Sequence, residues 1–207
     1  MLAELKNQLG DNAIAKAFDI TDEPDSVEQL RELISIMGGT DIIVIAAGTA
    51  LENPSLEWDN TKKTIDVNVI GFAAMAQTAY KYFSSRGSGH IVGITSISAI
   101  RGEDYFLPYS ATKAFQSNLL EALRVKARKS NVDVKITEIR PGFVDTDMPG
   151  RQDKRFWAVT AAQAGAGVVS AISKEQRLAY VPARWVLFGC ILKGLPAFLY
   201  EGLRSRY

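Results

Sequence analysis

The sequence of 207 residues predicts an α/β fold, in which helices cover both faces of a doubly wound parallel sheet. Apolar runs of strand length alternate along the chain with longer segments of helical periodicity. Several of these runs are apolar at nearly every position, as is typical of strands that are buried on both faces. Parallel strands need crossover connections, and the helical segments between the runs are long enough to provide them.

The first half of the chain gives two strands and one helix. Residues 12–20 predict a strand, because apolar and other residues alternate there. Residues 26–37 predict an amphipathic helix with its apolar side chains on one stripe. Residues 41–48 form a continuous apolar run that ends in glycine, which indicates a strand buried on both faces.

The second half repeats the alternation. Three more helices are expected, at residues 59–86, 107–130 and 160–173. Three more strands are expected, at residues 89–98, 132–142 and 178–182. No repeat, low-complexity tract or linker interrupts the pattern, so residues 1–207 are expected to form a single domain.

Composition excludes several classes of function. A formal net charge of +1 gives no electrostatic basis for binding nucleic acid. The single cysteine, Cys190, cannot form an internal disulfide, and the single histidine, His90, leaves no His/Cys cluster for zinc. The first 20 residues are charged and lack the apolar stretch of a signal peptide, so we expect a cytoplasmic protein.

The chemistry starts at Tyr-Ser-Ala-Thr-Lys, residues 109–113, where the helix over 107–130 begins. Tyr109 and Lys113 are four residues apart and therefore share one face of that helix. A nearby ammonium lowers the pKa of a phenol, which is about 10 in water, and prepares it for acid/base chemistry. A surface pair at helical spacing is the alternative, and the two residues alone do not decide between them.

Three further motifs surround this pair. Ser96 lies thirteen residues before Tyr109, at the end of a predicted strand. Asn68 lies in the helix over 59–86, and Arg-Pro-Gly-Phe-Val-Asp-Thr occupies residues 140–146 after another strand. Together these motifs resemble the classical short-chain dehydrogenase/reductase family, over nearly the whole chain from about Asp19 onward.

The resemblance implies a Rossmann-like fold and an NAD(P)-dependent oxidoreductase that interconverts an alcohol and a carbonyl by hydride transfer. Tyr109 is implied to be the general acid/base, and Lys113 to lower the pKa of its phenol and bind the nicotinamide ribose. Ser96 is implied to hydrogen-bond the substrate oxygen. Asn68 is implied to hold a water that links Lys113 to solvent; an asparagine that bonds backbone where a helix bends is the alternative.

The resemblance also implies contacts with the cofactor. Asp19 and its neighbour Ile20 take the place of the family's adenine contact, and a turn or helix-capping role for Asp19 is the alternative. Residues 45–48 stand where the family has Asn-Asn-Ala-Gly, and both asparagines are missing. The implied contacts in that segment are Ala46, Ala47 and Gly48. Those on the nicotinamide half are Tyr109, Lys113, Pro141, Gly142, Val144 and Thr146.

The family's phosphate-binding turn, Thr-Gly-x-x-x-Gly-x-Gly, occurs nowhere in these residues. We therefore expect a Rossmann-like fold that lacks its first two strands, with a start site assigned at an internal methionine as the origin. In the family's strand order those strands lie between residues 12–20 and 41–48, so the run at 41–48 should become an open edge. A repacked sheet in which these two segments are adjacent is the alternative. The choice between NAD and NADP cannot be read, because its residues belong to the missing part.

Residues 184–207 are strongly apolar, but their longest uncharged run is eight residues, against roughly 20 for a membrane span. A helix pair that closes the core or contacts another subunit, a lid over an apolar pocket and a helix at a membrane surface remain open. A homodimer or homotetramer is expected for the complete fold, through the helices over 59–86 and 107–130. The second helix carries Leu119, Leu120 and Leu123, more apolar surface than one inner face needs.

Two functional alternatives also remain open. One is a non-catalytic remnant that acts as a binding or regulatory protein. The other is a membrane-surface enzyme that acts on lipid-like substrates.

Overall fold

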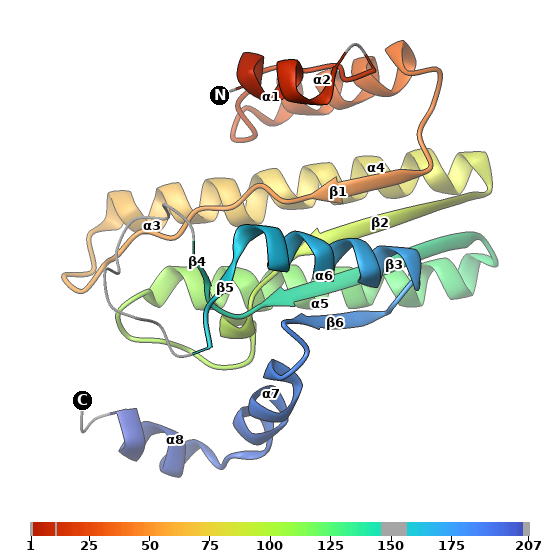
Figure 1. The fold of residues 1–207 in the computed structure, drawn as a ribbon. Helices are drawn as coiled ribbons and strands as arrows, with labels where there is room; N and C mark the ends of the chain where they lie inside the picture. Colours follow the sequence, from red (N-terminus) through yellow and green to blue (C-terminus); the bar gives the residue numbers. More distant parts are fainter. Residues whose placement is uncertain (1, 11, 146–156, 205–207) are drawn as a thin grey trace.

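The computed structural model describes residues 2–10, 12–145 and 157–204 (Figure 1). Its central element is a four-stranded parallel sheet in the order β1-β2-β3-β6. These strands are β1 (Ile42–Ile45), β2 (Ser88–Ile94), β3 (Asp133–Pro141) and β6 (Leu178–Val181). A separate two-stranded parallel sheet pairs β4 (Val144–Asp145) with β5 (Val159–Thr160).

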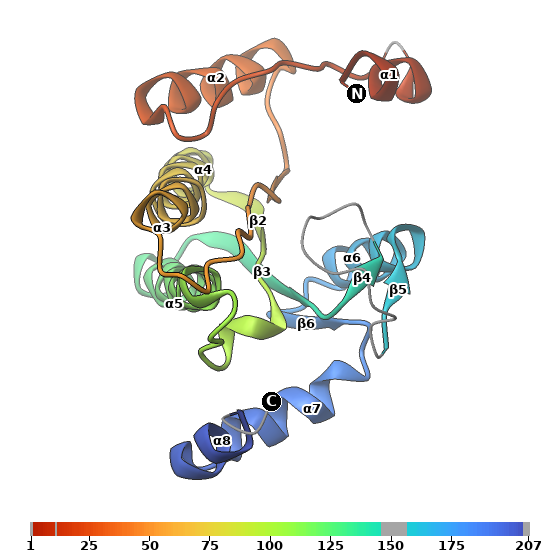
Figure 2. The ribbon, with the colours of Figure 1, turned by 90° about the vertical axis from the view of Figure 1, so that its left-hand side faces the viewer.

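Helices lie on both faces of the main sheet, with α3, α4 and α5 on one side and α6 on the other (Figure 2). The helices are α1 (Leu2–Leu9), α2 (Glu23–Ile36), α3 (Trp58–Ile65), α4 (Phe72–Arg86), α5 (Leu107–Ser130), α6 (Ala161–Ser173), α7 (Trp185–Gly194) and α8 (Ala197–Arg204). A π-helical turn, Asp66–Gly71, joins α3 to α4, and a 3-10 turn, Ile97–Ala99, follows β2. The predicted α/β fold with a parallel, Rossmann-like sheet is confirmed.

Local sequence explains where the long helices begin and end. Pro108 occupies the first turn of α5, where its missing N–H removes no hydrogen bond. Asn131 ends the same helix in the left-handed conformation, at φ 51°. The helix α6 begins with a capping box, in which Thr160 and Gln163 exchange side-chain and backbone hydrogen bonds. These local signals account for the close match between predicted and observed helices.

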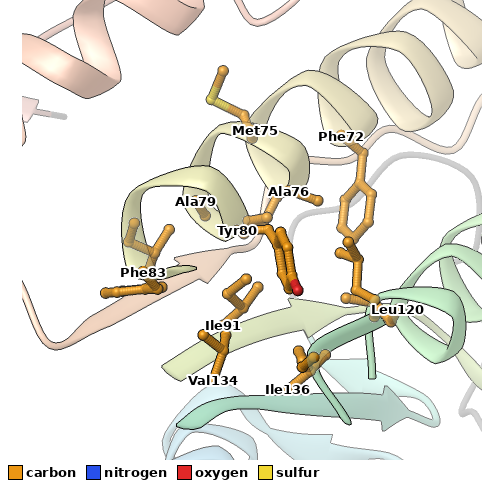
Figure 3. Close-up of a cluster of buried hydrophobic side chains, with 14 of the residues drawn as sticks. Phe72, Met75, Ala76, Ala79, Tyr80, Phe83, Ile91, Leu120, Val134 and Ile136 are labelled. Atoms are coloured by element: carbon orange, nitrogen blue, oxygen red, sulfur yellow. The ribbon is translucent and has the colours of Figure 1, made fainter. Parts of the chain in front are cut away.

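The larger core lies between the sheet and the pair α4 and α5 (Figure 3). Phe72 and Phe83 of α4, Ile91 of β2 and Leu120 of α5 are fully buried in it. Gly93 faces this core, and a Cβ atom there would lie 2.5 Å from Leu120. The absence of a side chain at Gly93 therefore allows α5 to pack closely on the sheet.

A smaller core fills the opposite face. Val92 of β2, Ile139 of β3 and Val181 of β6 pack there with Ala171 of α6. Adjacent residues of β2 thus serve different cores, Ile91 one and Val92 the other, as the alternation of strand side chains requires. The prediction that β2 is buried on both faces is correct.

Two predictions about the first strands are wrong. Residues 12–20 contain no strand, and Ile14 and Phe18 are exposed. A strand needs a hydrogen-bonded neighbour, and no described strand pairs with residues 12–20. The alternative of a repacked sheet is therefore not observed.

The second error concerns burial of β1 on both faces. Ile43 and Ile45 enter the larger core, whereas Ile42 and Val44 are 44% and 46% exposed. The reason is that α6 packs on β3 and β6 and does not reach β1. Among the described strands β1 pairs only with β2, so it is the open edge that the sequence predicted.

Replacing Leu120 with alanine tests the central packing. We expect Leu120→Ala to lower the free energy of unfolding by roughly 2–5 kcal/mol, because the cavity faces Gly93 and cannot collapse onto a side chain. Urea unfolding followed by circular dichroism measures the change. Val125→Ala on the same helix, where the side chain is 49% exposed, is the control and should shift stability by less than about 0.5 kcal/mol. Equal unfolding midpoints for the two variants would contradict this account of the core.

Candidate functional site

The predicted catalytic side chains meet at the carboxyl ends of β2 and β3. Ser96 follows β2, whereas Tyr109 and Lys113 lie on the first turns of α5. All three line one cavity of about 330 Å³. The same cavity is lined by five of the predicted cofactor residues, Ala46, Gly48, Pro141, Gly142 and Val144.

Ser96 is held by the turn that follows β2. Its backbone is extended, and its hydroxyl accepts a hydrogen bond of 3.1 Å from the backbone N–H of Ser98. The preceding residue, Thr95, donates to the buried carboxylate of Glu138, at 3.0 Å. Of these two hydroxyl residues, Ser96 is the one that hydrogen-bonds with Tyr109.

Lys113 is almost completely buried, at 4% exposure. Its ammonium donates to the backbone carbonyl of Ile94, at 3.1 Å, and to Oε1 of Gln116, at 2.9 Å. Burial lowers the pKa of Lys113 to about 8, because water no longer stabilises the charged form. The ammonium lies 5.6 Å from the centre of the Tyr109 ring.

The expected lowering of the Tyr109 pKa by Lys113 is not what this structure gives. Burial raises the pKa of the phenol, a hydrogen bond with Ser96 opposes the rise, and the charge of Glu103 adds to it. The physical reason is burial of the phenol, which is the largest cause of the shift, while the Lys113 ammonium hydrogen-bonds Ile94 and Gln116. Loss of solvent around the phenol therefore outweighs the cation.

Asn68 lies in the π-helical turn, and its side chain is fully used by protein groups. Its amide nitrogen donates to the Thr49 carbonyl, at 2.8 Å, and to the Thr112 hydroxyl, at 3.0 Å. Its amide oxygen accepts from the Thr49 N–H, at 2.9 Å. The side chain thus fixes the segment after β1 to α5, which is the structural alternative that the sequence left open.

Gln116 is a site residue that the sequence reasoning missed. It is fully buried, accepts from Lys113 and donates to the backbone carbonyl of Asn68, at 2.8 Å. The Gln116 side chain therefore connects the Lys113 ammonium to the π-helical turn at Asn68. The family resemblance implied that a water held by Asn68 would make contact with Lys113. The spacing of Gln116 was a usable signal, since Tyr109, Lys113 and Gln116 recur on one face of α5.

The other predicted cofactor residues border a second hollow. Asp19, Ile20, Ala46 and Ala47 line a space of about 740 Å³ beside β1. The carboxylate of Asp19 accepts from the N–H and the hydroxyl of Thr21, at 2.9 and 2.8 Å, so this residue forms a turn.

Two glycines keep the cavity open, and the remaining predicted residue lies outside the described part. A Cβ atom at Gly48 would approach Nζ of Lys113 to 3.2 Å, and one at Gly142 would overlap the Trp185 ring. Thr146 lies outside the described residues. No group of three His, Cys, Asp or Glu side chains that could hold a metal ion occurs in the described ranges.

The burial of Lys113 leads to a testable titration. We expect Lys113 to lose its proton near pH 8, whereas an exposed lysine titrates near pH 10.4. NMR of isotopically methylated lysines measures this, with Lys113→Arg to assign the resonance. Because the unfolded chain keeps that proton to higher pH, Lys113 should make folding more favourable as pH rises from about 8 toward 10.4.

A carboxylate at residue 116 supplies the matched perturbation. Gln116→Glu places a negative charge beside the ammonium and should raise the Lys113 pKa by about one unit or more. Gln163→Glu, at an exposed position on α6, should leave it unchanged. A Lys113 resonance that titrates together with exposed lysines would show that the site is wetter than this geometry allows.

Sequence comparison identifies the family. The family model described as short chain dehydrogenase matches residues 1–156. An uncharacterized oxidoreductase of Myxococcus xanthus is 36% identical over 133 residues, which cover 63% of this chain and 52% of that protein. An uncharacterized oxidoreductase of Mycobacterium tuberculosis is 31% identical over 185 residues, which cover 87% of this chain and 72% of that protein.

Solved structures agree with that assignment. Serine dehydrogenase from Escherichia coli is 30% identical, with a TM-score of 0.64 over 69% of this chain and 66% of that one. The match to a short-chain dehydrogenase from Streptomyces avermitilis has a TM-score of 0.73 and covers 99% of this chain and 81% of that protein. Because the two sequences are only 19% identical, this match supports the fold alone. The match thus spans about half the length of the Myxococcus relative. This chain belongs to the short-chain dehydrogenase family of oxidoreductases.

Proposed function

We propose that the site interconverts an alcohol and a carbonyl on a small molecule, with a nicotinamide dinucleotide as the redox partner. One observation carries the proposal. Ser96, Tyr109 and Lys113 line a single cavity of about 330 Å³ together with five other residues that were expected to contact the cofactor, three of them on its nicotinamide half. A hydroxyl, a phenol and an ammonium are the groups needed to orient and protonate a carbonyl oxygen.

Each side chain then has one task. Ser96 donates a hydrogen bond to the substrate oxygen and stabilises the charge that develops on it. Tyr109 transfers a proton to that oxygen during reduction and removes it during oxidation. Lys113 supplies positive charge near the phenol and a donor for the nicotinamide ribose. A bound NAD(P) would supply or accept the hydride.

At neutral pH Tyr109 is in the form that can donate a proton to a carbonyl oxygen. Burial raises the pKa of Tyr109, so the phenol carries its proton and is ready to donate it. Lys113, with a pKa of about 8, is mainly protonated at pH 7. A water-poor cavity also strengthens the hydrogen bonds that act on the substrate oxygen.

The residues fit the nicotinamide half of the cofactor better than the rest of it. Gly48 leaves room for a ribose beside Lys113, since even a methyl group there would approach Nζ to 3.2 Å. The sequence has no glycine-rich turn to hold the pyrophosphate on backbone N–H groups at a helix N-terminus. Asp19 already uses its carboxylate within a turn, which makes its role with adenine the weakest of the proposed contacts.

Relatives do not choose between NAD and NADP for this chain. Serine dehydrogenase, 30% identical with a TM-score of 0.64, has been solved with NADP+. A 7α-hydroxysteroid dehydrogenase, 26% identical with a TM-score of 0.62, has been solved with NADH and a 7-oxo bile acid conjugate. We therefore propose NAD(P) as the cofactor without a preference.

The absence of a phosphate-binding turn favours a second candidate for the chain of 207 residues. This candidate is a binding or regulatory protein that uses the same cavity without turnover. Turnover at millimolar NADH or NADPH separates the two functions, because only an oxidoreductase transfers the hydride.

Assembly into dimers remains a proposal. The sequence argument for it, surplus apolar surface at three leucines of α5, is weaker than expected. Leu120 and Leu123 are buried in the larger core, and Leu119 packs against it, so these leucines leave no surplus for a partner. Leu107, Phe115 and Val125 are the large apolar residues of α5 that are exposed and that a second copy would contact.

Substitution of Tyr109 tests the catalytic role. We expect Tyr109→Phe to lower carbonyl reduction by roughly 10²–10⁴-fold, with cofactor affinity nearly unchanged, because only the proton donor is lost. Lys113→Ala should reduce both. Turnover is measured with millimolar NADH and NADPH, so that weak cofactor binding does not hide it.

Tyr80→Phe is the matched control. Tyr80 lies in the core between α4 and the sheet, and its hydroxyl has no hydrogen-bond partner within the described residues. Its replacement should leave turnover unchanged. Near wild-type turnover of Tyr109→Phe would overturn the assignment of Tyr109 as acid/base.

Cofactor titration tests the missing phosphate anchor. We expect neither NADH nor NADPH to bind the chain of 207 residues with micromolar affinity, because the sequence has no glycine-rich turn to hold the pyrophosphate at a helix N-terminus. Reduced nicotinamide mononucleotide, which lacks the adenine half, should bind within about tenfold of NADH, a difference of about 1.4 kcal/mol. Fluorescence titration measures all three ligands. Micromolar binding of either dinucleotide would show that another part of the chain anchors the phosphates.

A further inference from the structure

The last two helices, α7 and α8, form a pair that extends from β6 away from the sheet (Figures 1 and 2). The family model ends at residue 156, before this C-terminal helix pair. Among the residues of the pair whose burial the structure describes, Trp185 and Gly189 alone are buried. The large apolar side chains of the pair that are exposed are Val186, Leu187, Phe188, Ile191, Phe198, Leu199 and Leu203. The pair therefore does not close the core, which was one of the structures considered for it.

Specific contacts fix which side of the pair faces outward. Trp185 packs edge-on against Phe143 and Phe188 at the base of α7. Arg101 donates to the carbonyls of Leu192 and Leu195, where α7 ends, and the first of these bonds is 2.8 Å long. At α8 the Tyr200 hydroxyl donates to the Gly102 carbonyl, at 2.6 Å.

These contacts leave the apolar side chains on the outside. Leu187 is 67% exposed and Phe198 is 71% exposed. Leu187 and Ile191 are four residues apart and share one face of α7, whereas Leu199 and Leu203 share one face of α8. Each helix thus presents an apolar stripe to solvent, while the end of α7 and Tyr200 of α8 contact the loop at residues 100–102.

Charge indicates what covers this surface. Residues 184–207 contain four basic residues, Arg184, Lys193, Arg204 and Arg206, and one acidic residue, Glu201. A second copy that paired through the same surface would bring these like charges together. An anionic lipid surface instead offers the opposite charge together with an apolar layer.

Helix length decides between crossing a membrane and lying on it. In the described ranges no single helix is long and apolar enough to span a bilayer, and α7 and α8 pass that test only together, with a bend of 116° between them. A bend of this size suits helices that lie in the interface with their apolar stripes toward the acyl chains.

We propose that the C-terminal helix pair binds the surface of anionic membranes. The apolar stripes of α7 and α8 enter the boundary between head groups and acyl chains. Basic residues such as Lys193, which is exposed at the end of α7, contact the lipid phosphates. This proposal does not depend on the proposed catalytic activity.

Vesicle co-sedimentation with the chain of 207 residues tests the proposal. We expect binding to vesicles that contain phosphatidylglycerol and at least about tenfold weaker binding to pure phosphatidylcholine, because basic side chains contribute to the affinity. The double variant Leu187→Gln/Phe198→Gln should weaken binding at least about tenfold, and Lys193→Glu should weaken it on anionic vesicles alone. Val169→Gln, which replaces an equally exposed apolar residue on α6, is the control and should bind like the unmodified chain.

Several results would overturn the proposal. No binding to anionic vesicles would do so, as would binding that the double variant does not change. Equal binding to both lipids would show that basic side chains do not contribute to the affinity for the membrane. Light scattering without vesicles tests whether a second copy of the chain covers this surface. If the chain is a dimer and the double variant is a monomer, the surface serves self-association instead of membrane binding. Circular dichroism of each variant shows whether a loss of binding reflects unfolding.

Discussion

A buried ammonium has to find hydrogen-bond acceptors, and this requirement of Lys113 connects the parts of the molecule around the site. Its charge lies where three elements meet, the end of β2, the first turns of α5 and the π-helical turn before α4. Ile94 and Gln116 supply the acceptors. Because Gln116 in turn donates to the irregular helix at Asn68, displacement of any of these elements would leave a buried polar group without a partner. The same network fixes the phenol of Tyr109, since both side chains belong to one face of α5.

The elements that sequence predicted well are those whose signals are local. Proline and asparagine mark the ends of α5, and the hydrophobic period gives its length, so the predicted range and the observed helix coincide. The spacing of Ser96, Tyr109 and Lys113 also belongs to this class, because a strand end and a helix start recur at fixed positions in the family. These residues do meet in one cavity.

The failures concern properties that depend on distant parts of the chain. Residues 12–20 have the alternation of a strand, but hydrogen bonding in a sheet needs a neighbour that periodicity cannot reveal. The exposure of Val44 depends on where α6 packs, more than a hundred residues away in sequence. The direction of the Tyr109 pKa shift depends on how deeply the folded chain buries the phenol, which the spacing of Tyr109 and Lys113 does not reveal.

The open edge of β1 allows association between chains to compete with folding of a single chain. Ile42 and Val44 are exposed beside backbone groups that no described strand pairs, and the hollow of about 740 Å³ next to them can admit an extended segment. Closure of the core is a first-order process, whereas pairing between two such edges is second-order and rises with concentration. Recovery of folded protein is therefore governed by dilution more than by temperature, and a Lys or Pro on this edge would change the yield without changing the stability of the core.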